Sequence, residues 1–154
     1  MEWNTIHTQE NADYLIRIAE HFHDWYLAGF EYDPLARVDS DEKSLARFTS
    51  ETDTLTILFR YDSVDENGDW PELELQFLGV YSMGFSSCKE PDPFYECRLE
   101  ETARGWAFVG DDPLTDEERN CPQDIKAGLY AVGGEVRWRL VGGTLWALEH
   151  EEEA

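Results

Sequence analysis

Near the amino terminus, apolar residues recur at helical spacing and predict one helix from about residue 9 to 21. Thr8 is positioned to cap this helix, and Glu10 and Asp13 suit its positive first turn. The apolar stripe expected to face a core consists of Ala12, Leu15, Ile16, Ala19 and Phe22.

After this helix the apolar pattern changes to every second residue, which predicts strands. Trp25 to Tyr32 is expected to form the first strand, and Thr54 to Tyr61 and Glu72 to Val80 alternate cleanly. Between the last two, Asp62 to Pro71 contains Asn67-Gly68, a pair favoured in tight turns. We therefore expect these two strands to pair as an antiparallel hairpin.

The second half of the chain predicts another hairpin, a helical turn and a meander. The hairpin pairs Phe94 to Glu100 with Gly105 to Val109, and Thr115 with Glu118 forms the capping-box pattern of a single helical turn. Two glycine pairs, at 133–134 and 142–143, are expected to separate the last three strands. These strands span Ala127 to Val132, Val136 to Val141 and Leu145 to Leu148.

Together these elements predict a β-rich α+β fold: one N-terminal helix followed by about eight mostly antiparallel strands, in a sandwich or a partly open barrel. Residues 1–154 are expected to form a single domain, with residues 150–154 frayed. The chain is 42% apolar and has six Trp, seven Tyr and eight Phe, so a folded domain is favoured over disorder.

Targeting segments and cysteines place limits on the compartment. No apolar run approaches the roughly 20 residues needed to cross a bilayer, and the amino terminus lacks the basic and apolar parts of a signal peptide. A cytoplasmic protein is expected. Cys88, Cys97 and Cys121 are odd in number and lack C-x-x-C spacing, so neither a disulfide framework nor a four-thiolate zinc site is indicated.

The charge of the chain changes this picture most. It has 34 Asp and Glu against 12 Lys and Arg, a formal net charge of -22. Solubility of a small domain is commonly met by a net charge of about 2 to 8, so the excess calls for a further reason. A polyanionic partner is disfavoured by such a field, whereas a basic partner or a cation is favoured.

Most of the acidic residues fall in clusters within predicted loops. Such carboxylates can imitate duplex phosphates, which supply one charge per about 1.7 Å of helix axis. Trp70 beside the hairpin clusters suits an aromatic anchor ringed by charge. The alternative is a solvated surface that prevents association between sheet edges. The predicted partner-binding residues are Asp62, Asp65, Glu66, Asp69, Trp70, Asp111, Asp112, Asp116, Glu117 and Glu118.

Histidine and carboxylate converge in the sequence at His21-x-His23-Asp24. These residue types can ligate a metal or act as acid and base; alternatively, Asp24 caps or braces the corner between helix and strand while His21 stabilises the negative end of the helix. Residues 63–74 partly match a calcium loop, but Ser63 replaces the first acidic ligand and the flanking segments resemble strands. No nucleophile motif, zinc-protease motif or glycine-rich phosphate loop is present.

Residues Tyr14 to Asp24 end in His21-Phe22-His23-Asp24 before a strand, and a later strand closes on Phe77-Leu78-Gly79. In these features the first 80 residues or so resemble a group of small acidic proteins, from Gram-positive bacteria and their mobile elements, that carry a Phe-His-Asp signature. The layout of that group is similar to immunity proteins that accompany secreted toxins. The resemblance implies an inhibitor and assigns no residue a role.

The sequence thus favours a non-enzymatic, cytoplasmic, acidic inhibitor that needs no cofactor. Its expected partner is the basic, nucleic-acid-binding surface of a nuclease or CRISPR effector, and binding to nucleic acid or to a membrane is not expected. It would act as an anti-CRISPR-like DNA mimic or as an immunity protein against a nuclease toxin. The alternative is a metal-binding protein or metal-dependent enzyme centred on His21, His23 and Asp24.

Overall fold

The computed structural model of the protein describes residues 2–34, 36–40, 46–50, 53–85, 93–111, 113–125 and 128–149, with the backbone alone at 36–40, 46–50 and 149. Among the helices in these ranges, none is both long and apolar enough to span a lipid bilayer.

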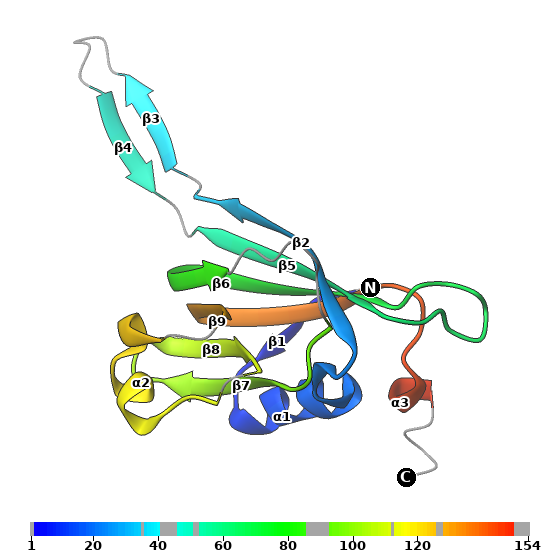
Figure 1. Cartoon of the computed structure of the whole chain (residues 1–154). Coiled ribbons are helices and arrows are strands. Elements are labelled where there is room, and N and C mark those ends of the chain that lie inside the picture. Colours follow the sequence, from blue (N-terminus) through cyan, green and yellow to red (C-terminus); the bar gives the residue numbers. More distant parts are fainter. Residues whose placement is uncertain are drawn as a thin grey trace.

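One antiparallel sheet of seven strands forms the body of the molecule (Figure 1). Its order is β2-β5-β6-β9-β8-β7, and β1 pairs with the part of β9 that β8 leaves uncovered. The bounds are β1 Asn4–Ile6, β2 Trp25–Asp33, β5 Thr54–Tyr61, β6 Glu72–Phe85, β7 Cys97–Thr102, β8 Gly105–Gly110 and β9 Leu129–Gly142. Two further strands, β3 Ala36–Ser40 and β4 Ala46–Ser50, form a separate two-stranded ribbon. The predicted β-rich α+β class is confirmed.

The sheet stays open, but its two edges approach each other at one corner. The amide of Asp24 donates to the carbonyl of Phe94 at 2.9 Å, and the amide of Phe94 donates to the carbonyl of Trp25 at 2.8 Å. These bonds join the start of edge strand β2 to the segment that leads into edge strand β7. The sheet is therefore curled around its core without continuous pairing of β2 with β7.

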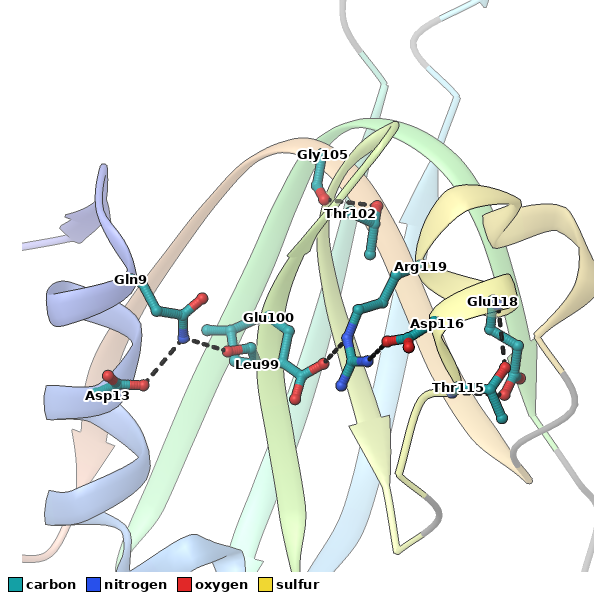
Figure 2. Close-up of polar contacts among 10 residues, drawn as sticks. All are labelled: Gln9, Asp13, Leu99, Glu100, Thr102, Gly105, Thr115, Asp116, Glu118 and Arg119. Atoms are coloured by element: carbon teal, nitrogen blue, oxygen red, sulfur yellow. Dashed lines mark hydrogen bonds and ion pairs between the residues drawn. The ribbon is translucent and has the colours of Figure 1, made fainter.

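Helix α1, Gln9–Ile18, begins at the predicted cap. Thr8 accepts a hydrogen bond from the amide of Asn11, and the Asn11 side chain accepts one from the amide of Thr8, which satisfies two donors at the helix start. Gln9 also donates to the carbonyl of Leu99 at 3.1 Å, so α1 is held beside edge strand β7 (Figure 2). The buried side of the helix consists of Ala12, Leu15, Ile16 and Ile18.

The helix ends earlier than predicted because the chain turns left-handed. A short 3-10 turn, η1 (Glu20–Phe22), has φ values of 52°, 59° and 57° in place of the negative values of a continuing helix. This turn directs Phe22 into the core, where its side chain is fully buried. Its ring lies 5.0 Å from that of Phe59 and 5.3 Å from that of Phe108. The left-handed turn thus positions a central core residue.

Alternation in β5 and β6 places one face of each strand in the core, as the sequence predicted. The register pairs Leu55 with Phe77, Ile57 with Leu75 and Phe59 with Leu73. All six side chains are fully buried. Burying such side chains contributes about 1.5–3 kcal/mol each, so this hairpin is a large part of the hydrophobic core.

The predicted meander at the carboxyl end is wrong in two places. Strand β9 runs without interruption through Gly133 and Gly134. A side chain at Gly133 would approach the Cβ of Phe77 to 3.1 Å, so this glycine allows close packing and does not mark a turn. The predicted last strand is instead a helical turn, α3 Trp146–Glu149. The second glycine pair does end β9, with Gly143 at a φ of 67°.

The predicted capping box between the hairpin and β9 is confirmed. Thr115 and Glu118 exchange hydrogen bonds at the start of helix α2, Asp116–Asn120, which is followed by a 3-10 turn, η2 Pro122–Asp124. The amide of Ala103 donates to the carbonyl of Arg119 at 3.0 Å. Helix α2 is thereby attached to the turn between β7 and β8.

Candidate functional site

Strand pairing brings together two predicted sites: the acidic loop proposed to contact a partner and the His21–Asp24 group proposed to bind a metal. Trp25 at the start of β2 lies opposite Tyr61 at the end of β5. The amide of Asp62 donates to the carbonyl of Asp24 at 3.1 Å. The acidic loop that follows β5 (residues 62–71, the β5–β6 loop) therefore lies beside the His21–Asp24 corner.

The pKa of Tyr61 reflects the negative charges that this arrangement brings together. Its pKa is raised from the usual value, first by burial and then by the negative charges of Asp62, Glu20 and Asp24. Carboxylates from η1 (Glu20), from the residue before β2 (Asp24) and from the β5–β6 loop (Asp62) therefore act on one group. We call the surface formed by Glu20, Asp24 and Asp62 around Tyr61, together with Asp65 and Glu66 of the same loop, the acidic end.

Asp65 organises the β5–β6 loop. Its Oδ1 accepts from the amides of Asn67 and Asp69, each at 2.9 Å. Its Oδ2 accepts from the amide of Thr144 at 3.0 Å and from the Thr144 hydroxyl at 3.1 Å. These bonds, that from the Asp69 amide first, hold the pKa of Asp65 below its usual range. Asp65 therefore stays ionised while it fastens the loop to the segment after β9.

Residues 63–74, which partly match a calcium loop in sequence, do not have the structure of one. Both oxygens of Asp65 are engaged by protein donors. Glu74, the proposed last ligand, lies on β6 and pairs with Arg139 at 3.1 Å. The loop is therefore built around hydrogen bonds from its own backbone and from Thr144.

The other predicted contact residues of this loop are exposed. Asp62 accepts a hydrogen bond from the neighbouring Ser63 hydroxyl at 2.9 Å. The carboxylates of Glu66 and Asp69 are exposed and have no ion pair or side-chain hydrogen bond within the described part of the chain. Trp70 is 45% exposed. This predicted group thus remains together on one loop.

The second predicted group lies elsewhere. Asp111 follows β8 and accepts from the amides of Tyr95 and Glu96 at 2.8 and 3.0 Å. Asp116 pairs with Arg119 at 2.8 Å and Glu118 completes the capping box, as Figure 2 shows. Glu117 is exposed, and Asp112 lies outside the described residues.

Helix α2 and the β5–β6 loop lie at opposite ends of the sheet (Figure 1). The ten predicted contact residues therefore do not form one continuous surface. Only the group on the β5–β6 loop belongs to the acidic end, because Glu20 and Asp24 lie beside that loop.

The histidines of the His21–Asp24 corner have different partners. Nδ1 of His23 lies 2.9 Å from Oδ2 of Asp24, whereas Nδ1 of His21 lies 3.9 Å from Oε1 of Glu96. Within the ranges that the structure describes, no group of three His, Cys, Asp or Glu side chains is arranged to hold a metal ion. The metal-centred alternative thus gains no support, and the contacts fit a braced corner.

A cavity of about 230 Å³ opens at the acidic end. It lies between the β5–β6 loop and the segment that follows β9, with Trp25 and Tyr61 in its wall. Sequence reasoning missed it, since Trp25 matched a core strand residue and 145–148 was predicted to be a strand. The lining residues are Trp25, Tyr61, Ser63, Val64, Asp65, Glu66, Pro71, Thr144, Leu145 and Trp146.

Ion pairs inside the molecule leave most of the negative charge in place. Arginines at 60, 98, 119 and 139 pair with carboxylates of Glu72, Glu96, Glu100 and Glu74 at 3.0–3.5 Å. However the 12 basic residues are paired, the excess of -22 remains, because it is the difference between the two totals. The charge is thus available to act on a partner.

Comparison with known proteins adds no relative. No protein-family model matches the chain, and no curated protein or solved structure matches it. The resemblance to the Phe-His-Asp group therefore stays a prediction from the sequence.

Proposed function

We propose that this protein is a non-enzymatic acidic inhibitor that binds the basic, nucleic-acid-binding surface of a partner protein in the cytoplasm. The observation that carries the proposal is the charge excess of -22, which ion pairs within the chain cannot remove. A nuclease or a CRISPR effector presents the kind of basic groove that such a charge would fill.

The acidic end is the surface that we assign to this contact. No lysine or arginine is among the described residues that line the cavity or raise the pKa of Tyr61. Negative charge there comes from three separate segments of the chain, so it is concentrated by the fold and not by the local sequence alone. A field of this kind speeds encounter with a basic partner and rejects acidic ones.

The experiment is a binding titration against purified basic nucleases and a CRISPR effector complex at two salt concentrations. Because the attraction is between net charges, affinity for a true partner is expected to fall at least about tenfold between about 50 and about 200 mM salt. DNA added to the mixture should compete with the protein for the same groove. Binding that is indifferent to salt, or absent across the panel, contradicts the proposal.

Two double variants test whether the acidic end makes the contact. Glu66→Gln with Asp69→Asn removes two exposed charges from the β5–β6 loop. Glu101→Gln in β7 with Glu117→Gln in α2 also removes two exposed charges, and it serves as the matched control because α2 lies at the end of the sheet opposite the β5–β6 loop. The first variant should lose more affinity than the second. Equal losses of affinity would mean that the partner responds to the net charge of the protein and not to the acidic end.

A further inference from the structure

The cavity at the acidic end has the size for one side chain. Sites for drug-sized ligands commonly measure about 300–1,000 Å³, and this cavity is about 230 Å³. It is bounded on one side by the fastened β5–β6 loop and on the other by residues 144–146. Trp25, which also lines it, is only 2% exposed, and its ring lies 5.5 Å from that of Tyr61.

The residues that line the cavity include both aromatic side chains and carboxylates. The aromatic residues are Trp25, Tyr61 and Trp146, of which Trp146 is 63% exposed. Glu66 supplies a carboxylate with no ion pair or side-chain hydrogen bond among the described residues, and Asp65, whose oxygens already accept from four donors, adds negative charge. Aromatic faces attract cations through the ring quadrupole, and neighbouring carboxylates add to that attraction.

The negative charge of this cavity is maintained by the structure. Four donors keep the Asp65 carboxylate ionised. Glu20, Asp24 and Asp62 add a further negative potential at Tyr61, where together with burial they raise the pKa of the hydroxyl. An anion would be repelled from this cavity, and a neutral apolar side chain would gain no stabilisation from its negative potential.

We propose that this cavity is an anchor pocket that receives an arginine side chain of the basic partner. Arginine fits better than lysine, because its planar guanidinium stacks on aromatic rings, is weakly hydrated and can donate to a carboxylate at the same time. An anchor of this type converts a long-range charge attraction into a fixed orientation of the partner. The inference rests on the proposed function for its biological meaning, but the pocket itself can be tested without the partner.

The probe is N-acetyl-arginine methylamide, titrated into protein labelled with ¹⁵N at tryptophan. The indole signals of Trp25 and Trp146 should shift together and saturate in the millimolar range. The corresponding lysine amide should bind more weakly, and the uncharged citrulline amide should leave both signals unmoved. Absence of a saturable shift, or equal shifts with the citrulline amide, overturns the pocket assignment.

Variants separate recognition from folding. Trp146→Ala should weaken binding of the arginine amide roughly tenfold, whereas Trp146→Tyr, which keeps an aromatic face, should retain most of it. Phe30→Ala is the control, because Phe30 is an exposed aromatic residue that does not line the cavity. If Phe30→Ala weakens the probe as much as Trp146→Ala, the site is assigned to the wrong place.

The outcome is independent of the partner experiment. A partner that binds wild type and Trp146→Ala equally well, with the expected salt dependence, leaves the proposed function in place and overturns the anchor. If the arginine amide binds saturably but no basic protein in the panel binds, the pocket stands and the proposed function is overturned.

Discussion

Thr144 donates two hydrogen bonds to Oδ2 of Asp65, one from its amide at 3.0 Å and one from its hydroxyl at 3.1 Å, across 79 residues of sequence. The same carboxylate holds the β5–β6 loop through two of the loop's own amides. One charged side chain thus shapes the loop and joins it to the segment after β9, beside the cavity.

Asp65→Asn should lower the midpoint of urea unfolding at pH 7, because an amide cannot accept four hydrogen bonds as an ionised carboxylate does. The folded state holds the pKa of Asp65 below its usual value. The stabilisation from the carboxylate is thus fully present above about pH 4. It is lost as the pH falls through the lowered folded-state pKa.

The difference between wild type and Asp65→Asn should accordingly be larger at pH 7 than at pH 3. Tryptophan fluorescence during urea unfolding measures it at both values. Asp69→Asn is the control in the same loop, because its carboxylate makes no such bonds among the described residues. An equal effect of the two variants at pH 7 contradicts the role given to Asp65.

Local patterns were enough to predict much of the fold. The capping residues Thr8 and Thr115 and the alternation of Leu55, Ile57 and Phe59 act over a few positions, so their signals are complete within the sequence. The Gly133-Gly134 pair misled because its meaning depends on Phe77, which packs against it from another strand. A glycine that avoids a clash cannot be told from a turn glycine by its neighbours in sequence.

The candidate site was predictable only in part. The acidic loop was found from its composition, but its proximity to Glu20 and Asp24 follows from the pairing of β2 with β5. The wall formed by Leu145 and Trp146 depends on the chain turning back after β9. Both are long-range relations, and no local pattern records them.

The left-handed turn at η1 should be relieved by glycine. His21 has a φ of 59°, and a non-glycine residue in this region costs roughly 1–2 kcal/mol. Glycine also raises the entropy of the unfolded chain, which lowers the free energy of unfolding by about 0.5–1 kcal/mol. His21→Gly should therefore raise the free energy of unfolding by up to about 1.5 kcal/mol. The exposed contact of His21 with Glu96 at 3.9 Å contributes little.

Glu10→Gly provides the comparison for this prediction. Glu10 is exposed in the right-handed helix α1, where glycine should lower the free energy of unfolding by about 0.5–1 kcal/mol. Thermal and urea unfolding of both variants should thus move in opposite directions. Loss of stability in both would show that the φ of His21 is not a source of strain.

Gly105 should tolerate alanine far less than Gly68. Both have left-handed φ values, 118° and 82°. A Cβ at Gly105 would lie 2.2 Å from the carbonyl oxygen of Gly133, whereas one at Gly68 meets nothing within 4 Å. Gly68→Ala should cost about 1–2 kcal/mol from its backbone alone. Gly105→Ala should cost at least about 1–3 kcal/mol more, because β8 must move away from β9. Similar unfolding midpoints for the two variants would contradict this packing.

Cys97 and Cys121 should differ in reactivity in the folded protein. The Cys97 side chain is fully buried, and this burial, followed by the negative charge of Asp111, raises the pKa of its thiol far above the usual range. Since the thiolate is the reactive form, Cys97 should resist iodoacetamide at pH 8. Cys121 is partly exposed and should be alkylated first. Peptide mapping by mass spectrometry measures both sites in one sample, and the same reaction in urea should label both. Equal labelling of the two thiols before unfolding would mean that β7 separates readily from the rest of the fold, contrary to its contacts with α1 and α2.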